Sequence, residues 1–466
     1  MAEIHKKMLA EVKDKVVFHE ALQRGLTYID SVLERNVYPT DEALDNLNQF
    51  DESMPEEPSS AMDVIRKLDH YGSPATVAQI GGRYFGFVNG SVVPSGLSAK
   101  LLASFWDQNT AMYVISPIAA KLETVVQQWL KSLFGLPEQT VAGFVSGTSA
   151  ANLCGLAAAR FRVLKNQGWD INQRGFHGAP PIRIITSKEA HSTVIKALGL
   201  LGFGYNLIEF VETDSQGRIR ADLIPELDDK SILILAAGNV NSGSFDNFSE
   251  ICLTARKADA WIHIDGAFGL WASGTKKLSH LTRGIEQANS WAVDGHKTLN
   301  TPYDCGIVLC SDKEALTSAL HMSAGYLVLS DTRDGMFYTP EMSRRARIIE
   351  LWATLKYLGT VGIDQMVYEM HERAKQFAAE LSGIDGFTVM NEVVFNQVIV
   401  VCESDSLTEK VLGFIQQDRV CWVGGSTWKG KKVIRISVCS WATTEQDVSV
   451  SVHSFKSCLD KALGKE

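Results

Sequence analysis

The sequence predicts an α/β protein whose main sheet is mostly parallel, and three observations support this class. Segments 182–186, 232–236 and 261–265 are short apolar runs of the kind found in strands buried on both faces. Helical patterns alternate with these runs from about 76 to 310. After 346 the pattern changes to a long helix and paired β segments, which predicts a smaller α+β domain. With 466 residues, the chain is too long for a single core.

The first 75 residues are predicted to form a helical arm. Apolar residues recur at helical spacing through 1–50, and an acidic connector interrupted by prolines occupies 51–59. A helix is expected to start at Ser60, with Asp63 three residues later as in a capping box. Such an amphipathic arm packs either on the partner subunit of a dimer or on its own chain, and the sequence favours neither arrangement over the other.

The large domain is expected to span 76–345 and the small C-terminal domain 346–466. In the large domain, helices are predicted through 122–133 and from Ser149 to Arg160, and a further strand at 307–310. In the small domain, a long helix is predicted around 348–358, with β segments at 387–390, 394–401, 420–423 and 433–438.

Composition narrows the class of protein. The chain is 45% hydrophobic and 21% charged, as in a soluble globular enzyme, and its net charge of −9 argues against a nucleic-acid binder. The eight cysteines form no CxxC pair, so neither a zinc site nor a redox motif is expected, and no other metal site is predicted. A polar N-terminus and the lack of a long apolar run predict a cytoplasmic protein without a membrane segment.

The turn around Lys297 is the most informative segment of the chain. Lys297 follows His296 directly, downstream of a predicted strand that ends in Asp265. An amine held near a carbonyl forms a Schiff base, and an acid beside a pyridine nitrogen keeps that ring protonated. A carboxylate at the end of an apolar run needs a cationic partner, which is either a pyridinium or an arginine. The pattern therefore indicates pyridoxal phosphate chemistry.

The segment 144–152 is rich in small residues and precedes a predicted helix. Gly147, Thr148 and Ser149 would let the backbone approach a phosphate, and amides of the first helical turn would point at it. The alternative is an ordinary helix N-cap. No Gly-Lys-Ser/Thr follows, so this is not a Walker loop.

Two further post-strand turns carry candidate residues. His191 follows a buried strand, where open α/β sheets bind their ligands. Its imidazole either stacks on an aromatic cofactor or has a structural role. In the next such turn, Asn241 and Asp246 either flank the cofactor or close the turn.

With these segments placed, the chain resembles the group II pyridoxal phosphate-dependent amino-acid decarboxylases, which include the aromatic amino-acid, histidine and glutamate decarboxylases. The resemblance implies aminotransferase-like fold type I, with a seven-stranded, mostly parallel sheet. The matching segments run in family order through 83–87, 116–117, 122–123, 146–149, 190–192, 265–267, 296–297, 302–306, 343–345 and 435–437.

The resemblance also implies how pyridoxal 5′-phosphate is held. Lys297 would form the Schiff base, Asp265 would pair with the pyridine nitrogen, and His191 would stack on the ring. Ala267 would lie against the other face of the ring. The full set of expected cofactor-binding residues is Gly147, Thr148, Ser149, His191, Asn241, Asp265, Ala267, His296 and Lys297.

Substrate contacts are implied at three places. Arg435 matches the family arginine near the substrate carboxylate. Tyr326 falls where the family has a loop tyrosine that protonates the α carbon. Tyr338 is the alternative, because the segment between Tyr326 and Arg344 is shorter than in the aromatic amino-acid decarboxylases. The segment 84–87, which includes Tyr84 and Phe85, either lines the side-chain end of the pocket, which favours an aromatic substrate, or packs at a subunit interface. The expected catalytic residues are Lys297, His191, Asp265 and Tyr326.

The expected reaction is decarboxylation of an L-amino acid, with an aromatic substrate favoured, to give an amine and carbon dioxide. The alternatives on the same cofactor are a carbon–carbon lyase, an aldehyde-forming oxidative decarboxylase and an aminotransferase. A catalytically silent homologue is a further alternative, against which the retention of Asp265 and Lys297 argues. The resemblance also implies a homodimer with shared active sites, in which 109–116 face the neighbour's cofactor.

Overall fold

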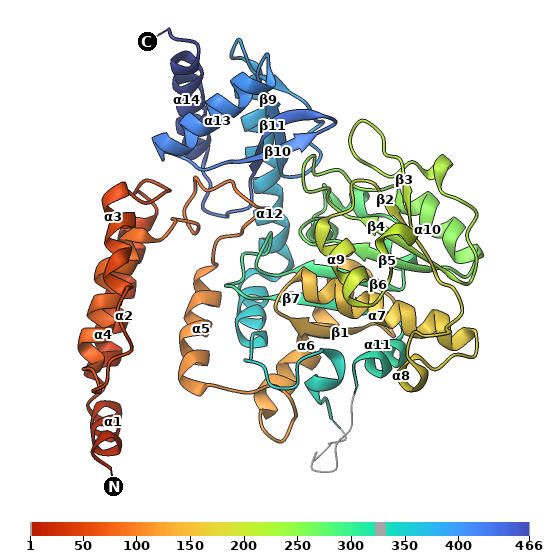
Figure 1. Ribbon diagram of the computed structural model, residues 1–466, viewed down its shortest axis with the longest axis horizontal. Coiled ribbons are helices and arrows are strands. Elements are labelled where there is room, and N and C mark those ends of the chain that lie inside the picture. Colours follow the sequence, from red (N-terminus) through yellow and green to blue (C-terminus); the bar gives the residue numbers. More distant parts are fainter. Residues whose placement is uncertain (1, 322–331, 466) are drawn as a thin grey trace.

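The computed structural model describes residues 2–321 and 332–465, and it is built around a seven-stranded sheet (Figure 1). The strand order is β1-β7-β6-β5-β4-β2-β3. The neighbouring pairs from β6 to β3 are parallel, whereas β7 runs antiparallel to both β1 and β6. The predicted fold class is therefore confirmed. The strands are β1 Val141–Val145, β2 Arg183–Ser187, β3 Ile208–Val211, β4 Ser231–Ala236, β5 Trp261–Asp265, β6 Ser290–Asp294 and β7 Gly306–Cys310.

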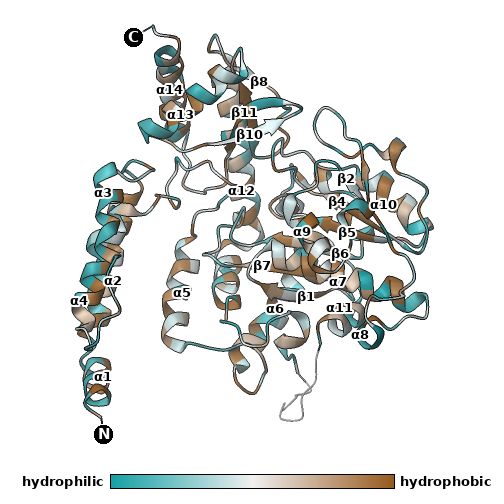
Figure 2. Ribbon diagram, viewed as in Figure 1, coloured by the Kyte–Doolittle hydropathy of each residue, from teal (hydrophilic) through white to brown (hydrophobic). Residues whose placement is uncertain are grey.

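Helices cover both faces of this sheet, which explains why the central strands are mostly apolar. In β4, Ile232 and Ile234 enter one core together with α7 (Thr148–Asn166) and α9 (Ser192–Leu200). Leu233 and Leu235 enter the opposite core with α6 (Pro117–Phe134) and α10 (Phe248–Lys257). Brown, hydrophobic segments accordingly gather in the central strands in Figure 2. A strand covered on both sides carries mostly apolar side chains on both of its faces.

The sheet brings five strand ends to one edge. Strands β2, β4, β5 and β6 are parallel, and β1 points the same way because β7 reverses direction between β1 and β6. Ligands bind outside the carboxyl ends of strands in open α/β sheets. The segments after β1, β2, β4, β5 and β6 are the ones that carry the predicted site residues.

A second, antiparallel sheet of order β10-β11-β9-β8 belongs to the C-terminal region. Helix α12 leads into it and changes direction at Gly359, which has φ 56°. The predicted strand at 420–423 is wrong: only Trp422 makes an isolated bridge there, and the strand lies at 424–428. The tight turn at Lys429 and Gly430, both with positive φ, sets this register. The elements are α12 Ile348–Ser382, β8 Thr388–Val389, β9 Gln397–Val401, α13 Asp405–Asp418, β10 Gly424–Trp428, β11 Lys431–Ser437 and α14 Glu445–Ala462.

The N-terminal segment forms helices that stand beside the main body (Figure 1). Ser60 accepts a hydrogen bond from the amide of Asp63 and caps α4, as predicted. Apolar side chains on α1 and α2 remain exposed, among them Met8, Val12 and Leu22. The helices are α1 Glu3–Asp14, α2 Val16–Val32, α3 Asp41–Asp45, α4 Ala61–Lys67 and α5 Pro94–Trp106, and later in the chain α8 Ile171–Arg174 and α11 Lys313–Leu320.

The domain limits at residues 75 and 345 stay predictions. Within residues 2–321 and 332–465, none of the helices has the length and apolar character needed to cross a membrane.

Candidate active site

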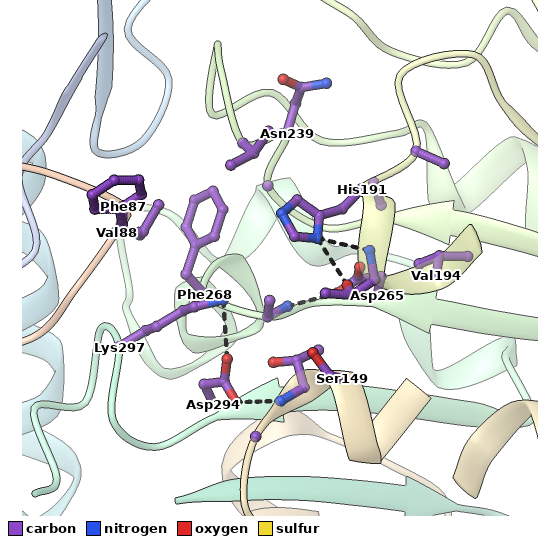
Figure 3. Close-up of a pocket in the computed structure, with 18 of the residues that line it drawn as sticks. Phe87, Val88, Ser149, His191, Val194, Asn239, Asp265, Phe268, Asp294 and Lys297 are labelled. Atoms are coloured by element: carbon purple, nitrogen blue, oxygen red, sulfur yellow. Dashed lines mark hydrogen bonds and ion pairs between the residues drawn. The ribbon is translucent and has the colours of Figure 1, made fainter. Parts of the chain in front are cut away.

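A cavity of about 460 Å³ opens at the carboxyl edge of the large sheet (Figure 3). Its walls come from segments that follow β1, β2, β4, β5 and β6, which are remote from one another in the sequence. The fold thus assembles most of the predicted cofactor residues around one space. Those that line the cavity are Gly147, Thr148, Ser149, His191, Asp265, Ala267, His296 and Lys297.

Asp265 is the last residue of β5 and is buried. One carboxylate oxygen accepts a hydrogen bond from the Ala267 amide at 3.2 Å, and the other accepts from Asn152 Nδ2 at 3.3 Å. Burial raises the pKa of the Asp265 carboxyl, and the nearby His191 and Lys297 oppose this effect. A cation placed in the cavity against Asp265 would favour the ionised carboxylate.

Lys297 enters the cavity on the side opposite Asp265 (Figure 3). It lies in the turn after β6, and its Nζ is 3.0 Å from Asp294 Oδ2. Asp294 is itself 2% exposed, so this is a nearly buried ion pair. The backbone at Gly90 packs directly against the Lys297 turn. A side chain at Gly90 would not fit there, since its Cβ would lie 2.1 Å from the Lys297 carbonyl oxygen.

The first turn of α7 forms an anion cradle. Thr148 is the first residue of the helix and its Oγ1 is buried without a hydrogen-bond partner. Gly147 lies directly before it, and a Cβ on Gly306 would approach the Gly147 Cα to 2.4 Å. An orphaned hydroxyl at a helix N-terminus, next to Gly147 and to a Gly306 that has no room for a Cβ, fits a phosphate group.

His296 presents a defined nitrogen to this cradle. Its Nδ1 accepts a hydrogen bond from the Cys305 amide at 3.0 Å, and burial lowers its pKa, so the ring is neutral and Nε2 carries the proton. Nε2 lies 3.5 Å from Asp294 Oδ2. The Tyr303 ring stacks on the imidazole with a centroid distance of 4.3 Å and fixes its plane.

His191 lies at the junction between β2 and α9. It is the N-cap of α9, where its Nδ1 accepts a hydrogen bond from the Thr193 amide and also contacts Thr193 Oγ1 at 2.8 Å. Burial lowers the pKa of His191, and the charge of Asp265 opposes that effect. The ring is therefore held in place and faces the cavity (Figure 3).

Several predicted site residues do not line this cavity. Phe85 packs edge-to-face on Phe377 in the core of the C-terminal region, at a centroid distance of 4.8 Å. Asn241 accepts a hydrogen bond from Ser426 Oγ and Asp246 accepts from the Ala236 amide, so both join segments of the fold. Asp246 therefore closes its turn, which is one of the two alternatives that the sequence left open.

Tyr84 and Arg435 lie behind the cavity wall. Arg435, on β11, donates a hydrogen bond to the Val240 carbonyl at 3.0 Å, while its Nε is buried without a partner. Tyr84 stacks on Trp422, with a centroid distance of 5.4 Å and an interplanar angle of 11°. Burial raises the pKa of Tyr84 to about 12, and the charge of Arg435 opposes this rise.

The structure describes one of the two candidate proton donors. Tyr326 lies outside the described residues. Tyr338 is buried beneath Arg333, whose guanidinium carbon is 4.0 Å from the centroid of the phenol ring, and does not line the cavity.

Phe87 belongs to the segment 84–87 that was predicted to line the pocket, whereas Val88, Phe268 and Asp294 are wall residues to which the sequence assigned no role. Phe87, Val88 and Phe268 form an apolar side of the cavity, and Asp294 forms part of its floor. Phe87 and Val88 have φ of 52° and 60°. Their side chains therefore do not alternate between two faces as they would in a strand. Asp294 directly precedes Gly295-His296-Lys297, and its place three residues before the lysine was the available signal.

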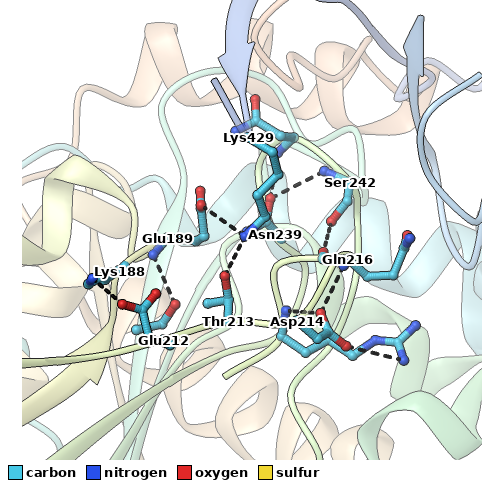
Figure 4. A network of polar contacts seen from close by, with 12 residues as sticks. Lys188, Glu189, Glu212, Thr213, Asp214, Gln216, Asn239, Ser242 and Lys429 are labelled. Carbon is cyan, nitrogen blue, oxygen red and sulfur yellow. Dashed lines mark hydrogen bonds and ion pairs between the residues drawn. The ribbon is translucent and has the colours of Figure 1, made fainter. Parts of the chain in front are cut away.

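A polar network ties the β10–β11 hairpin to the large domain beside the cavity (Figure 4). Lys429, in the hairpin turn, donates a hydrogen bond to Thr213 Oγ1 at 2.6 Å and contacts Glu189 Oε1 at 3.4 Å. Glu189 also lines the cavity, two residues before His191. The C-terminal hairpin is therefore connected to the cavity wall.

A lysine, a buried carboxylate and an anion cradle around one cavity at this edge of the sheet are the features of a pyridoxal phosphate enzyme of fold type I. Residues 44–402 match the pyridoxal-dependent decarboxylase conserved domain, so the chain belongs to that family. It is a pyridoxal phosphate-dependent amino-acid decarboxylase, as expected.

Individual relatives agree with this family. The chain is 27% identical over 458 residues to the aromatic-L-amino-acid decarboxylase of Bacillus atrophaeus, covering 92% of this chain and 93% of the relative. It is 26% identical to the cysteine sulfinic acid decarboxylase of Mus musculus, over 82% and 78% of the two chains. The solved structure of Oryza sativa TDC with PLP and tryptamine superimposes with a TM-score of 0.87, at 20% identity, over 97% and 98% of the chains.

Proposed function

We propose that this decarboxylase acts on an aromatic L-amino acid and releases the corresponding amine and carbon dioxide. The observation that carries the proposal is the apolar wall of Phe87, Val88 and Phe268 in the same cavity as Lys297. An aromatic side chain gains free energy by leaving water for such a wall, and offset or edge contacts with its rings add to this. The relative from Bacillus atrophaeus supports the same substrate class.

We assign the cofactor contacts as follows. Lys297 would bind the cofactor aldehyde, Asp265 would pair with the pyridine nitrogen, and His191 would lie on the ring. When bound, the cofactor would supply an electron sink for the electron pair that the departing carboxylate leaves on the α carbon. The phosphate is held by the segment around Thr148 and by the Nε2 proton of His296.

The remaining residues govern orientation and the final proton transfer. We propose that Arg435, with its unpartnered Nε and its position behind the Val240 carbonyl, orients the substrate carboxylate. The return of a proton to the α carbon is assigned to Tyr326, since Tyr338 is buried beneath Arg333. A tyrosine donor favours amine over aldehyde formation.

We also propose a homodimer with shared active sites in a reducing, cytoplasmic setting. Apolar side chains of α1 and α2 are exposed, and so are Tyr113, Val114 and Ile115 in the segment expected to face the neighbour. Exposed apolar faces of this kind are typical of subunit interfaces. All eight cysteines are free and buried, as expected in a reducing compartment.

The test is a substrate screen. The full chain, saturated with pyridoxal phosphate, is assayed for carbon dioxide release from the standard amino acids and cysteine sulfinate, and products are identified by mass spectrometry. The highest kcat/KM is expected with phenylalanine, tyrosine or tryptophan, with the amine as product. A preference for cysteine sulfinate, aspartate or glutamate would contradict the aromatic assignment. An aldehyde formed with oxygen consumption would contradict the assignment of Tyr326.

A further inference from the structure

A chain of buried polar side chains lies behind Asp265 and is not in contact with the cavity. It runs from β5 to β6, back to β5 and then to α7. Its four members are all at most 3% exposed: Trp261, Ser290, His263 and Asn152. Polar groups buried this deeply in a sheet core are costly unless every hydrogen bond is made.

The hydrogen bonds form one continuous series. Trp261 Nε1 lies 3.0 Å from Ser290 Oγ, and Ser290 Oγ lies 2.8 Å from His263 Nδ1. His263 Nε2 lies 2.9 Å from Asn152 Oδ1, and Asn152 Nδ2 lies 3.3 Å from Asp265 Oδ2. The series therefore ends on the carboxylate that we assign to the cofactor nitrogen.

Each proton in the series has one consistent place. An indole N–H is a donor only, so Ser290 accepts from Trp261 and gives its own proton to His263 Nδ1. Burial lowers the pKa of His263 to about 3, so the ring is neutral and its other nitrogen, Nε2, carries the proton. His263 then donates to the Asn152 oxygen, which leaves the Asn152 amide nitrogen to donate to Asp265.

The packing around His263 is adapted to this arrangement. His263 and Asp265 are two residues apart on β5, so both side chains point to the face of the sheet that α7 covers. Gly155 of α7 lies over the imidazole, and a Cβ there would approach His263 Cε1 to 2.6 Å. A glycine at this point of the helix leaves space for the histidine.

We propose that Ser290, His263 and Asn152 are positioning residues that present Asp265 to the cofactor as an ionised carboxylate. The inference rests on the assignment of Asp265 made above. A series with a fixed donor direction delivers an N–H to Asp265 Oδ2, and an N–H favours the charged carboxylate over the protonated acid. If Ser290 lost its hydroxyl, His263 would be free to carry its proton on Nδ1, and Asn152 could then turn its oxygen toward Asp265.

The first test uses the wild-type, cofactor-free protein labelled with 15N in its histidine rings. His263 is expected to give one protonated nitrogen, Nε2, and one unprotonated nitrogen, Nδ1, at neutral pH. A proton on Nδ1 would reverse the series and overturn the proposal. This readout needs neither cofactor nor activity, so it stands or fails separately from the role of Asp265.

The second test compares variants at the remote end of the series. Ser290→Ala is expected to change the His263 tautomer, to weaken pyridoxal phosphate binding about 10- to 100-fold and to lower kcat with little change in KM. Ser290→Thr, which keeps a hydroxyl, should restore the His263 tautomer, the cofactor affinity and kcat. Ser231→Ala is the control, because Ser231 is equally buried in the same sheet but bonds only to Asp228.

Two outcomes separate the inference from the function on which it rests. If Ser290→Ala leaves the His263 tautomer and the cofactor affinity within twofold of wild type, the series has no positioning role. If Asp265→Asn leaves cofactor binding and activity unchanged, the assignment of Asp265 to the pyridine nitrogen is wrong. The inference is then wrong as well, whichever nitrogen of His263 carries the proton.

Discussion

Asp294 bridges the lysine and the anion cradle: one carboxylate oxygen lies 3.0 Å from Lys297 Nζ, and the other accepts a hydrogen bond from the Thr148 amide at 2.6 Å. A buried carboxylate therefore occupies part of the helix terminus to which we assign the phosphate. The charge of Asp294 opposes a phosphate there while it balances the Lys297 ammonium.

We therefore expect Asp294→Asn to bind pyridoxal phosphate more tightly, by about tenfold, equivalent to ~1.4 kcal/mol. The asparagine keeps an oxygen for the Thr148 amide but removes the charge that repels the phosphate. Affinity is measured by titration of the cofactor-free protein. Pyridoxal without its phosphate is the matched ligand, and its affinity should change much less. Equal or weaker binding of the phosphorylated form would show that Asp294 does not oppose the phosphate.

Phe87 is predicted to determine substrate choice. It stacks on Trp422, at a centroid distance of 5.3 Å, and lines the cavity. Phe87→Ala should lower kcat/KM for an aromatic substrate by roughly 10- to 100-fold, since the aromatic contact and its buried area are lost. Phe210→Ala is the control, because Phe210 of β3 is also a partly exposed phenylalanine but does not line the cavity. Equal losses in both variants would indicate an effect on folding rather than on the substrate.

Gly306 is predicted to be required for the shape of the cradle. Because a Cβ would lie 2.4 Å from Gly147 Cα, Gly306→Ala should lower the free energy of unfolding by about 1–3 kcal/mol and weaken cofactor binding. Gly413→Ala, in α13 with nothing within 4 Å of the added atom, should instead stabilise by about 1 kcal/mol. Chemical denaturation compares the two. A Gly306→Ala protein as stable as wild type would show that the cradle adjusts.

Buried His263 should make the fold sensitive to acid. Its pKa is lowered to about 3 in the folded state, below the value of roughly 6.5 in an unfolded chain. The unfolded state then binds the proton more readily, so this stabilisation is complete above about pH 6.5 and is lost as the pH falls toward 3.

The slope of the free energy of unfolding against pH tests this. Between pH 6 and 4, His263 should contribute about 1.4 kcal/mol per pH unit, and this part of the slope should disappear in His263→Gln. His453→Gln, at an exposed position of α14, should keep the wild-type slope. An unchanged slope in His263→Gln would mean that His263 is protonated in the folded protein.

The sequence predicted the elements whose pattern has a single explanation. Strands β2, β4 and β5 were found because a short, mostly apolar run fits a strand covered on both faces. Strands β1, β3 and β6 were missed, since β1 has Ala142 and Gly143 at its centre, β3 is a short edge strand, and β6 begins and ends with polar residues, Ser290 and Asp294. The partners that bury those two residues are distant in the chain.

Within the site, strand ends and small-residue loops were predictable, and side-chain directions were not. Lys297, Asp265 and the segment at Thr148 follow strands, and the parallel order of the sheet then brings them to one edge. Phe85 and Phe87 were not distinguishable, because positive φ at Phe87 and Val88 turns the wall residue into the cavity and leaves Phe85 in a core. Backbone conformation of that kind leaves no sign in the residue types.

The most direct test of the account is to reduce the cofactor-loaded protein with borohydride, digest it and find the labelled peptide by mass spectrometry. We predict one modified residue, Lys297, carrying the reduced cofactor, and no label in Lys297→Ala at equal cofactor concentration. A label on another lysine, or stable loading of Lys297→Ala through a covalent bond elsewhere, would contradict the placement of the cofactor between Lys297 and Asp265.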